Sequence, residues 1–308
     1  MVKIFLFHRV SPFRDILWDP MDIPLFEKCI QYISSKYHVV LLEDLMMKRL
    51  KPEQAGKKKA CIVFDDGYKD NIEYAAPILC KYNIQASFYV VTDCIDKNIP
   101  TWTHQLDYAF QFTNTSAVNL AYDFLPVELQ IKSLTDKKDR IEFVRKLKPA
   151  LKKVTHEERQ IVMNAVLDAF KDIEMPRFMM NWDDLRLLKK LGHYIGSHTV
   201  NHVMLGTMIH KESIKSELVN SGEKIKNELG YFPLTISYPV GSYNETTIQL
   251  SKEAGYEIGL AVKQKVYNPK KDNVFEIPRI ELYNESWFKT RLRINNIIAT
   301  VSKILKRS

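Results

Sequence analysis

The sequence has little of what builds disulfide-stapled, fibrous or membrane-spanning proteins. Its 308 residues include four cysteines, and no two of them form a Cys-x-x-Cys pair, which excludes a disulfide framework and a thiolate zinc knuckle. With 10 glycines and 13 prolines the chain is neither collagen-like nor of low complexity. No apolar run reaches the roughly 18 residues that a membrane span needs. These absences leave a globular protein whose cysteines are expected to be small buried side chains.

No targeting segment is visible at the start of the chain. The apolar stretch Ile4–Phe7 is too short for the hydrophobic region of a signal peptide, and Arg9 follows it closely. We therefore expect a cytoplasmic protein. With 45% hydrophobic residues the chain can bury a large core, which excludes disorder as its main state.

Basic residues outnumber acidic ones and give a formal net charge of +8. They are dispersed, and no stripe of them alternates with aromatic residues, so we expect no nucleic-acid partner. The tail, residues 286–308, carries six Lys or Arg and no acid, and its apolar residues recur at steps of three and four: Ile294, Ile297, Ile298, Val301, Ile304 and Leu305. This pattern predicts a basic helix with one apolar face, which either docks on the body of the protein or lies on a membrane surface.

Short β-rich runs alternate with amphipathic helical stretches along most of the chain. The predicted strands are Lys3–His8, His38–Leu42, Ala60–Asp65, Ala86–Thr92, Tyr194–Ser197, Leu234–Tyr238 and Tyr256–Val262. The predicted helices between them include Leu25–Ser35, Asn71–Tyr82, Trp182–Leu191, Lys211–Leu229 and Thr246–Ala254. This alternation predicts an α/β protein with a parallel sheet, and the number of units indicates a barrel.

One region breaks the alternation. From about residue 98 to residue 177 no strand pattern is evident, and helical segments are predicted around His104–Phe112, Asp136–Lys153 and His156–Lys171. We interpret this region as a helical insertion, without a core of its own, in a single catalytic domain spanning residues 1–308. Insertions at strand ends often form lids or substrate walls, and a packing appendage is the alternative.

Two adjacent carboxylates, Asp65 and Asp66, follow the predicted strand that ends near Phe64, and Gly67 comes next. Barrel enzymes place catalytic groups at the C-terminal ends of their strands. Gly67 permits a sharp turn, so the two carboxylates can serve different tasks. The structural alternative is an ordinary Asp-Gly turn in which Asp66 caps the backbone.

A second strand exit carries two histidines four residues apart, His198 and His202. This spacing can place both imidazoles on one side of a helical turn. With one carboxylate from elsewhere in the chain they would form a His2Asp metal site that leaves a position open to water. The remaining histidines apart from His8 are expected to be structural: His38, His104, His156, His193 and His210.

These motifs resemble the first two motifs of the polysaccharide deacetylase family, the NodB-homology proteins of carbohydrate esterase family 4. Three further elements agree in order. Ser237–Asn244 resembles the third motif of the branch that contains the poly-N-acetylglucosamine deacetylases, and Phe7–Val10 is similar to the Tyr-His-x-Val element of that branch. Asn181–Leu185 resembles a recurrent W-x-x-L element, although a helix N-cap at Asn181 explains it equally well. The resemblance implies a distorted (β/α)7 barrel of the NodB-homology type.

The resemblance also implies that Asp66, His198 and His202 hold a divalent metal ion. Zinc is the expected metal, and iron, cobalt and nickel suit the same donor set. Asp65 would stay free as the general base for the attacking water, which explains why two adjacent carboxylates are needed. Such a metal ion lowers the pKa of a bound water towards about 7 and stabilises a developing oxyanion.

The other implied roles concern the oxyanion, the leaving amine and the sugar. The backbone N–H of Tyr238 would bind the oxyanion, and Pro239 would fix the turn that presents it. His8 would be the general acid that protonates the departing amine, because an imidazole titrating near neutrality suits a proton donor. Trp102, at the start of the insertion, is assigned to the substrate by its location alone.

The sequence departs from the family pattern in two places. Many members open the third motif with an arginine that pairs with the base carboxylate, and here Thr235–Ser237 stands at that place. We expect Arg279 to supply this charge from a later strand. The usual late Leu-x-His motif is absent because no histidine follows His210, so the acid is predicted to be His8. The alternative for His8 is a core histidine at a strand end.

We therefore predict a metal-dependent carbohydrate N-deacetylase. Its substrate would be an N-acetylhexosamine unit in a glycan, a lipid-linked saccharide or a smaller precursor. Peripheral contact of the basic tail with the inner face of the membrane would suit a lipid-linked substrate. The alternatives are an amidohydrolase that cleaves a non-carbohydrate C–N bond and a carbohydrate-binding protein whose catalytic groups have decayed.

Overall fold

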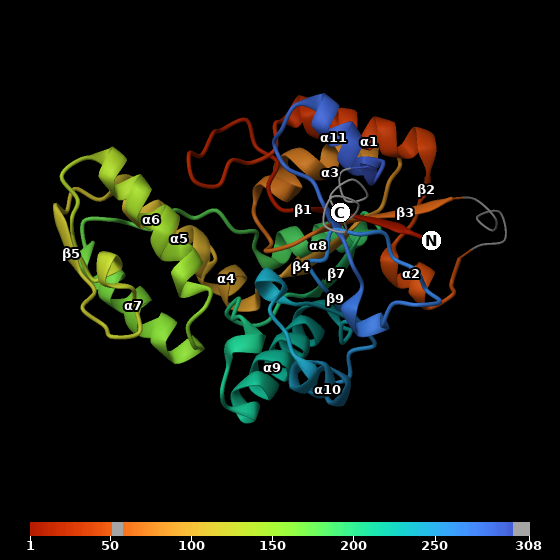
Figure 1. Ribbon diagram of the computed structural model, residues 1–308. Coiled ribbons are helices and arrows are strands. Elements are labelled where there is room, and N and C mark those ends of the chain that lie inside the picture. Colours follow the sequence, from red (N-terminus) through yellow and green to blue (C-terminus); the bar gives the residue numbers. More distant parts are fainter. Residues whose placement is uncertain (51–57, 298–308) are drawn as a thin grey trace, which may run out of the picture.

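Eight short strands form a curled parallel sheet at the centre of the molecule. The computed structural model describes residues 1–50 and 58–297. The strands are β1 (Lys3–Phe7), β2 (His38–Val39), β3 (Lys59–Phe64), β4 (Ser87–Val90), β7 (Tyr194–Ser197), β8 (Thr235–Ser237), β9 (Ile258–Leu260) and β10 (Ile280–Glu281). Helices surround the sheet, and a helical lobe stands at one side of it (Figure 1). This arrangement is a distorted (β/α)7 barrel, which confirms the predicted fold class.

The strand order explains how the sheet closes on itself. It runs β10-β1-β3-β4-β7-β8-β9, with β2 paired to β3 beside this path, and every pair is parallel. A parallel bridge between Leu260 and Ile277 brings the segment before β10 against β9. Each predicted strand overlaps an observed one. β10 was not predicted because its two residues are too few to show a pattern.

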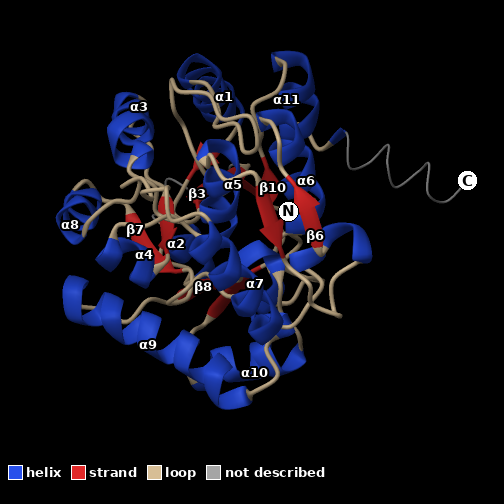
Figure 2. Ribbon diagram, turned by 90° about the vertical axis from the view of Figure 1, so that its left-hand side faces the viewer, coloured by secondary structure: helices blue, strands red, loops and turns tan. Residues whose placement is uncertain are grey.

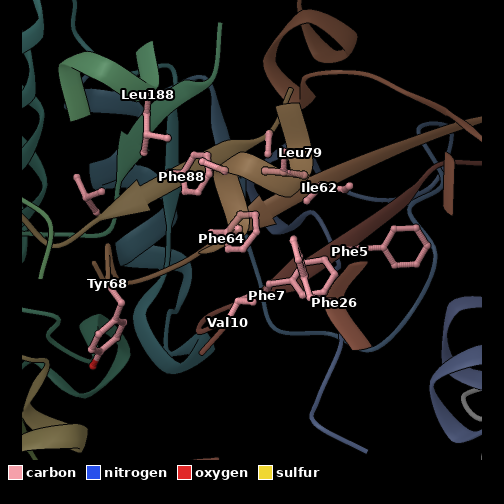
Figure 3. Packing of buried hydrophobic residues seen from close by; sticks show 14 of the residues in the cluster. Phe5, Phe7, Val10, Phe26, Ile62, Phe64, Tyr68, Leu79, Phe88 and Leu188 are labelled. Atoms are coloured by element: carbon pink, nitrogen blue, oxygen red, sulfur yellow. The ribbon is translucent and has the colours of Figure 1, made fainter. Parts of the chain in front are cut away.

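Aromatic packing between the sheet and its outer helices fixes the positions of β1, β3 and β4. The rings of Phe64 and Phe88 stack with their centroids 4.7 Å apart, and the ring of Phe7 stacks on Phe64 at 5.4 Å. Phe26 of α1 (Ile23–Lys36) packs edge-on against Phe7 (Figure 3). Because both faces of these parallel strands are covered, their residues are apolar without alternation, as expected for a buried sheet. Rigid packing here holds the strand ends that carry the functional side chains.

Most of the remaining helices of the barrel overlap predicted helical segments, and two of them, at residues 42–46 and 92–97, were not predicted. These helices are α2 (Leu42–Met46), α3 (Ala76–Lys81), α4 (Thr92–Lys97), α8 (Trp182–Lys190), α9 (Lys211–Leu229), α10 (Glu245–Glu253) and α11 (Trp287–Ile294). Asn181 caps α8 through a reciprocal pair of hydrogen bonds with Asp184, each 2.9 Å long, which confirms the predicted N-cap. Among the residues described, no helix is long and apolar enough to cross a membrane.

The insertion forms the separate lobe, and two expectations about it are wrong. Its elements are α5 (Trp102–Phe112), β5 (Ala117–Asn119), β6 (Ile131–Ser133), α6 (Lys137–Leu151) and α7 (His156–Ala169). β5 and β6 pair antiparallel, and they escaped prediction because strands of three residues show no pattern. The lobe also has a buried cluster of its own, in which Phe110, Phe143 and Val162 of its three helices meet. In Figure 2 it lies in front of the strands, over one end of the barrel.

The tail begins as predicted with a helix that packs on the body. Trp287 at the start of α11 contacts Tyr32 of α1 edge-on, with ring centroids 5.6 Å apart, and Ile294 is fully buried. The docked interpretation therefore holds for α11. Ile297 of the predicted apolar face is 44% exposed. Residues 298–308, which carry the other predicted apolar positions, lie outside the described residues, and the membrane interpretation stays a prediction.

Candidate metal centre and active site

Tight turns at the ends of two strands present the predicted metal ligands. Asp66 lies just after β3, and His198 lies just after β7. The backbone takes positive φ at Asp66 (77°), at Thr199 (71°) and at His202 (56°). Side-chain-bearing residues adopt this conformation at a cost of roughly 1–3 kcal/mol each, and such residues cluster at functional sites. The strained turns aim the carboxylate and both imidazoles at one place.

The three predicted ligand side chains converge without bonding to one another. Asp66 Oδ1 lies 3.3 Å from Nε2 of both His198 and His202, yet it accepts no hydrogen bond from any described residue. The Nδ1–H of His198 donates to the carbonyl of Ser237 at 2.7 Å, which leaves its Nε2 lone pair directed towards Asp66. One carboxylate and two imidazoles, all buried, form a donor set that fits a divalent cation.

Asp65 Oδ2 lies 4.0 Å from Nε2 of His198, but the carboxylate is hydrogen-bonded to a different group of partners. Arg279 Nη1 donates to both of its carboxylate oxygens at 2.8 Å, and the hydroxyl of Ser237 donates to them at 3.1 and 3.2 Å. Burial by itself raises the pKa of Asp65, but the charge of Arg279, followed by those of His198 and His8, lowers the pKa by more. The carboxylate is therefore held ionised. The predicted partnership of Arg279 with Asp65 is present.

His8 is held at the end of β1 by a polar clamp. Arg9 donates to Asp70 at 2.9 Å, and Asn71 donates to the His8 carbonyl at 2.8 Å. The His8 imidazole is exposed by 22%, and its Nδ1 lies 3.5 Å from the carboxylate of Glu281. His8 is thus a half-buried imidazole facing open space, which differs from a core histidine.

A cavity of about 310 Å³ joins these groups, at the low end of the range for ligand sites. The predicted residues that line it are Asp65, Asp66, His198, His202 and His8. The lining residues that the sequence did not single out are Trp18, Thr103, Asp107, Lys148, Lys152, Val240, Val262 and Glu281. Only Glu281 left a usable signal, because it stands two residues after Arg279, which was expected to lie beside Asp65.

Comparison with known proteins assigns this geometry to a family. The sequence profile of polysaccharide deacetylases matches residues 53–259. The chain belongs to the polysaccharide deacetylase family. It is 19% identical over 263 residues to YxkH of Bacillus subtilis (strain 168), a match that covers 85% of this chain and 64% of that protein. The chain thus spans less than two thirds of that relative. Membership supports deacetylation of a carbohydrate as the reaction class.

Solved deacetylase structures share the fold at low sequence identity. The Streptococcus pyogenes deacetylase PplD, in complex with acetate, superposes with a TM-score of 0.62 at 16% identity, covering 95% of this chain and 97% of that one. The de-N-acetylase from Aggregatibacter actinomycetemcomitans gives 0.60 at 18% identity, covering 95% and 99%. The BpsB deacetylase domain from Bordetella bronchiseptica gives 0.56 at 17%, covering 91% and 95%. These likenesses extend over nearly the whole chain, including the insertion.

In this polysaccharide deacetylase fold, the backbone N–H that was predicted to bind the oxyanion already has a partner. The backbone N–H of Tyr238 donates to the carbonyl of Leu260 at 3.1 Å, so sheet pairing with β9 already uses it. Neither Tyr238 nor Pro239 is among the residues lining the cavity. Two residues after Tyr238, Val240 does line it, has a positive φ of 57°, and its N–H donates to no described residue. The free donor of this turn is therefore Val240, with Pro239 at the start of the turn.

Trp102 is also not where the sequence suggested. Its side chain is 7% exposed within the buried cluster of the insertion, and the Arg159 guanidinium lies 5.2 Å from its ring centroid. It does not line the catalytic cavity. Trp18 supplies an aromatic wall there instead, with its ring 5.8 Å from that of His8. The loop that carries Trp18 has no periodic pattern, so sequence reasoning could not place it.

Proposed function

We propose that this chain is a divalent-metal-dependent hydrolase that removes the acetyl group from an N-acetylhexosamine unit of a glycan or glycan precursor. One observation carries the proposal. Asp66, His198 and His202 converge on a single point in a cavity, while the neighbouring Asp65 is kept out of that set by Arg279. A metal site and an independent carboxylate base are the two parts that amide hydrolysis by water needs.

The chain's own groups divide the reaction between them. Water attacks the acetyl carbon, Asp65 accepts the proton that the water loses, and the Val240 N–H donates to the oxygen that gains charge. The C–N bond then breaks, and His8 donates a proton to the amine nitrogen. A divalent cation held by Asp66, His198 and His202 would supply Lewis-acid polarisation at this point. Glu281 faces His8, with its carboxylate 3.5 Å from the Nδ1 atom.

The test is acetate release from a panel of N-acetylated sugars and oligosaccharides. We expect release that a chelator abolishes and that added zinc, or another of the suited metals, restores. Hydrolysis confined to amides without a sugar would replace the proposal with a non-carbohydrate amidohydrolase. Sugar binding without any release, in metal-loaded protein, would replace it with a carbohydrate-binding protein.

A matched pair of variants separates the two adjacent carboxylates. Asp65→Asn should lower kcat by about 10²- to 10⁴-fold, because it removes the base, and should leave the bound metal in place. Asp66→Asn should instead lower the metal content itself. Measuring the metal by mass spectrometry beside the rate distinguishes them, and metal loss from Asp65→Asn would contradict the assignment.

A further inference from the structure

One wall of the catalytic cavity comes from the insertion and not from the barrel. Lys148 lies in the last turn of α6, Lys152 is its C-cap residue, and both line the cavity together with Asp65 and Asp66. Residues four apart on a helix share a face, so the two lysines approach the cavity from the same side. In Figure 1 the lobe that carries α6 stands beside the barrel. The insertion therefore brings positive charge to a site whose reactive groups all belong to the barrel.

Three of the four acidic side chains that line this cavity each have a basic side chain close by. The pairs are Asp65 with Arg279, Asp107 with Lys148, and Glu281 with His8. Asp66 belongs to the proposed metal centre. The ammonium group of Lys152 forms no ion pair and no hydrogen bond with any described residue, and only the more distant charges of Asp107 and Glu281 act on it from within the chain.

Leaving this ammonium without a partner costs free energy. Lys152 is partly buried, and burial, followed by the nearby charge of Lys148, lowers its pKa by more than the charges of Asp107 and Glu281 raise it. A charge withdrawn from water is unfavourable unless an opposite charge meets it. The helix C-terminus favours a lysine at this point of the chain, but it does not require the side chain to face the cavity. Proteins leave a partly buried charge without a direct partner mainly at functional sites.

We propose that the saccharide substrate carries an anionic group, a phosphate or a carboxylate, on the acetamido sugar or on the sugar next to it, and that Lys152 binds this group. The inference rests on the proposed function, because the cavity that Lys152 lines is the one in which the acetyl group would be hydrolysed. Lys148 contributes less, since Asp107 neutralises it. A neutral glycan would leave the Lys152 ammonium unpaired in the complex.

The experiment measures binding without turnover. Isothermal titration of the full chain in the presence of a chelator, at low salt, uses three probes: N-acetylglucosamine 1-phosphate, N-acetylmuramic acid and the neutral methyl glycoside of N-acetylglucosamine. We expect an anionic probe to bind about tenfold more tightly than the neutral one, which is the effect of one charge-assisted hydrogen bond. High salt should reduce this advantage. A preference for the first or the second anionic probe identifies phosphate or carboxylate as the group.

Three variants assign the preference to one side chain. Lys152→Gln should abolish it, and Lys152→Arg should retain it because the charge stays. Lys153→Gln is the matched control, since Lys153 is the exposed neighbour that does not line the cavity, and it should leave the preference unchanged. Equal binding of all three probes, or a preference that survives Lys152→Gln, would overturn the inference.

Turnover by the metal-loaded chain separates this inference from the proposed function. If neutral N-acetylated sugars are hydrolysed and no binding preference exists, the deacetylase function stands and the role of Lys152 is wrong. If no N-acetylated sugar is hydrolysed but the preference depends on Lys152, the role of Lys152 stands and the deacetylase function is wrong.

Discussion

The proposed catalytic base, Asp65, pairs with one guanidinium that is fully buried beside it. Arg279 reaches both oxygens of Asp65 through Nη1, and its Nε donates to the carbonyl of Ala261 at 3.3 Å. This second bond fixes the plane of the guanidinium, which a lysine ammonium cannot imitate. Arg279 touches no part of the cavity, so it acts by positioning Asp65.

Replacing Arg279 should reveal this positioning role. We expect Arg279→Met to lower kcat by about 100-fold and Arg279→Lys by about tenfold, because lysine keeps the charge but loses the planar geometry. Metal content and the circular dichroism spectrum should not change in the lysine variant. Full turnover in that folded, metal-loaded variant and in Arg279→Met would show that Asp65 needs no such partner.

The imidazole of His8 faces the cavity on the side away from its backbone clamp. His8→Asn keeps a side chain of similar reach but cannot donate a proton at neutral pH. We expect kcat to fall by about 10²- to 10³-fold while the metal stays bound. The fall in kcat should be much smaller for a substrate whose leaving group is better than an amine, such as an O-acetyl sugar. Equal losses for both substrates would assign His8 to structure instead of acid catalysis.

At the scale of elements, the junction of α8 and β7 contains a pH-sensitive contact. His193 lies between them, and its Nδ1 accepts the N–H of Ala86, at the start of the adjoining β4 segment, at 3.1 Å. Burial lowers the pKa of His193 to about 4 in the folded chain. Below its ordinary value of 6.5 the unfolded chain takes up a proton that the folded chain refuses, so stability is lost as the pH falls from 6.5 towards 4.

This contact predicts a difference between two acid-denaturation curves. His193→Asn keeps an acceptor for Ala86 and removes the ionisation. Between pH 6.5 and pH 4 the wild type should therefore lose about 2–3 kcal/mol more unfolding free energy than the variant. Urea unfolding at a series of pH values measures it. Parallel curves for the two proteins would show that His193 takes no part.

At the scale of the whole molecule, the barrel and the insertion are separately packed but share one cavity. The proposed metal ligands all come from turns of the barrel, whereas Lys148, Lys152 and Asp107 in the cavity wall come from the insertion. The cluster that holds α5, α6 and α7 together consists of insertion residues with one buried residue of the barrel, Met204. Metal binding should therefore stabilise the barrel turns directly and the insertion hardly at all.

Hydrogen exchange with and without chelator tests this division. Metal removal leaves buried ligand atoms without partners on turns that already have positive φ, so amides at 65–68 and 197–203 should exchange faster. Amides in α6 and α7 should exchange at unchanged rates. A uniform increase over both parts would mean that they unfold as one cooperative unit.

Local pattern was enough to predict most of the barrel and half of its site. Strands rich in β-branched and aromatic residues, and the Asn181 cap, depend on interactions between near neighbours in sequence. The two aspartates and two histidines were recognisable because each pair follows a strand, and parallel strands end at the same edge of a sheet. The chemical types at those ends then indicated a metal and a base.

Long-range pairing decided everything else. Whether Tyr238 or Val240 has a free N–H depends on β9 lying beside β8, and no pattern around residue 238 contains that information. The side chains of Trp18 and Lys152 reach the cavity only because distant segments pack there. The sequence by itself thus determined the types of residue at the strand ends. Tertiary packing decided which backbone donor, aromatic ring and ammonium group face the cavity. The reason is that only packing determines which polar groups are left without a partner.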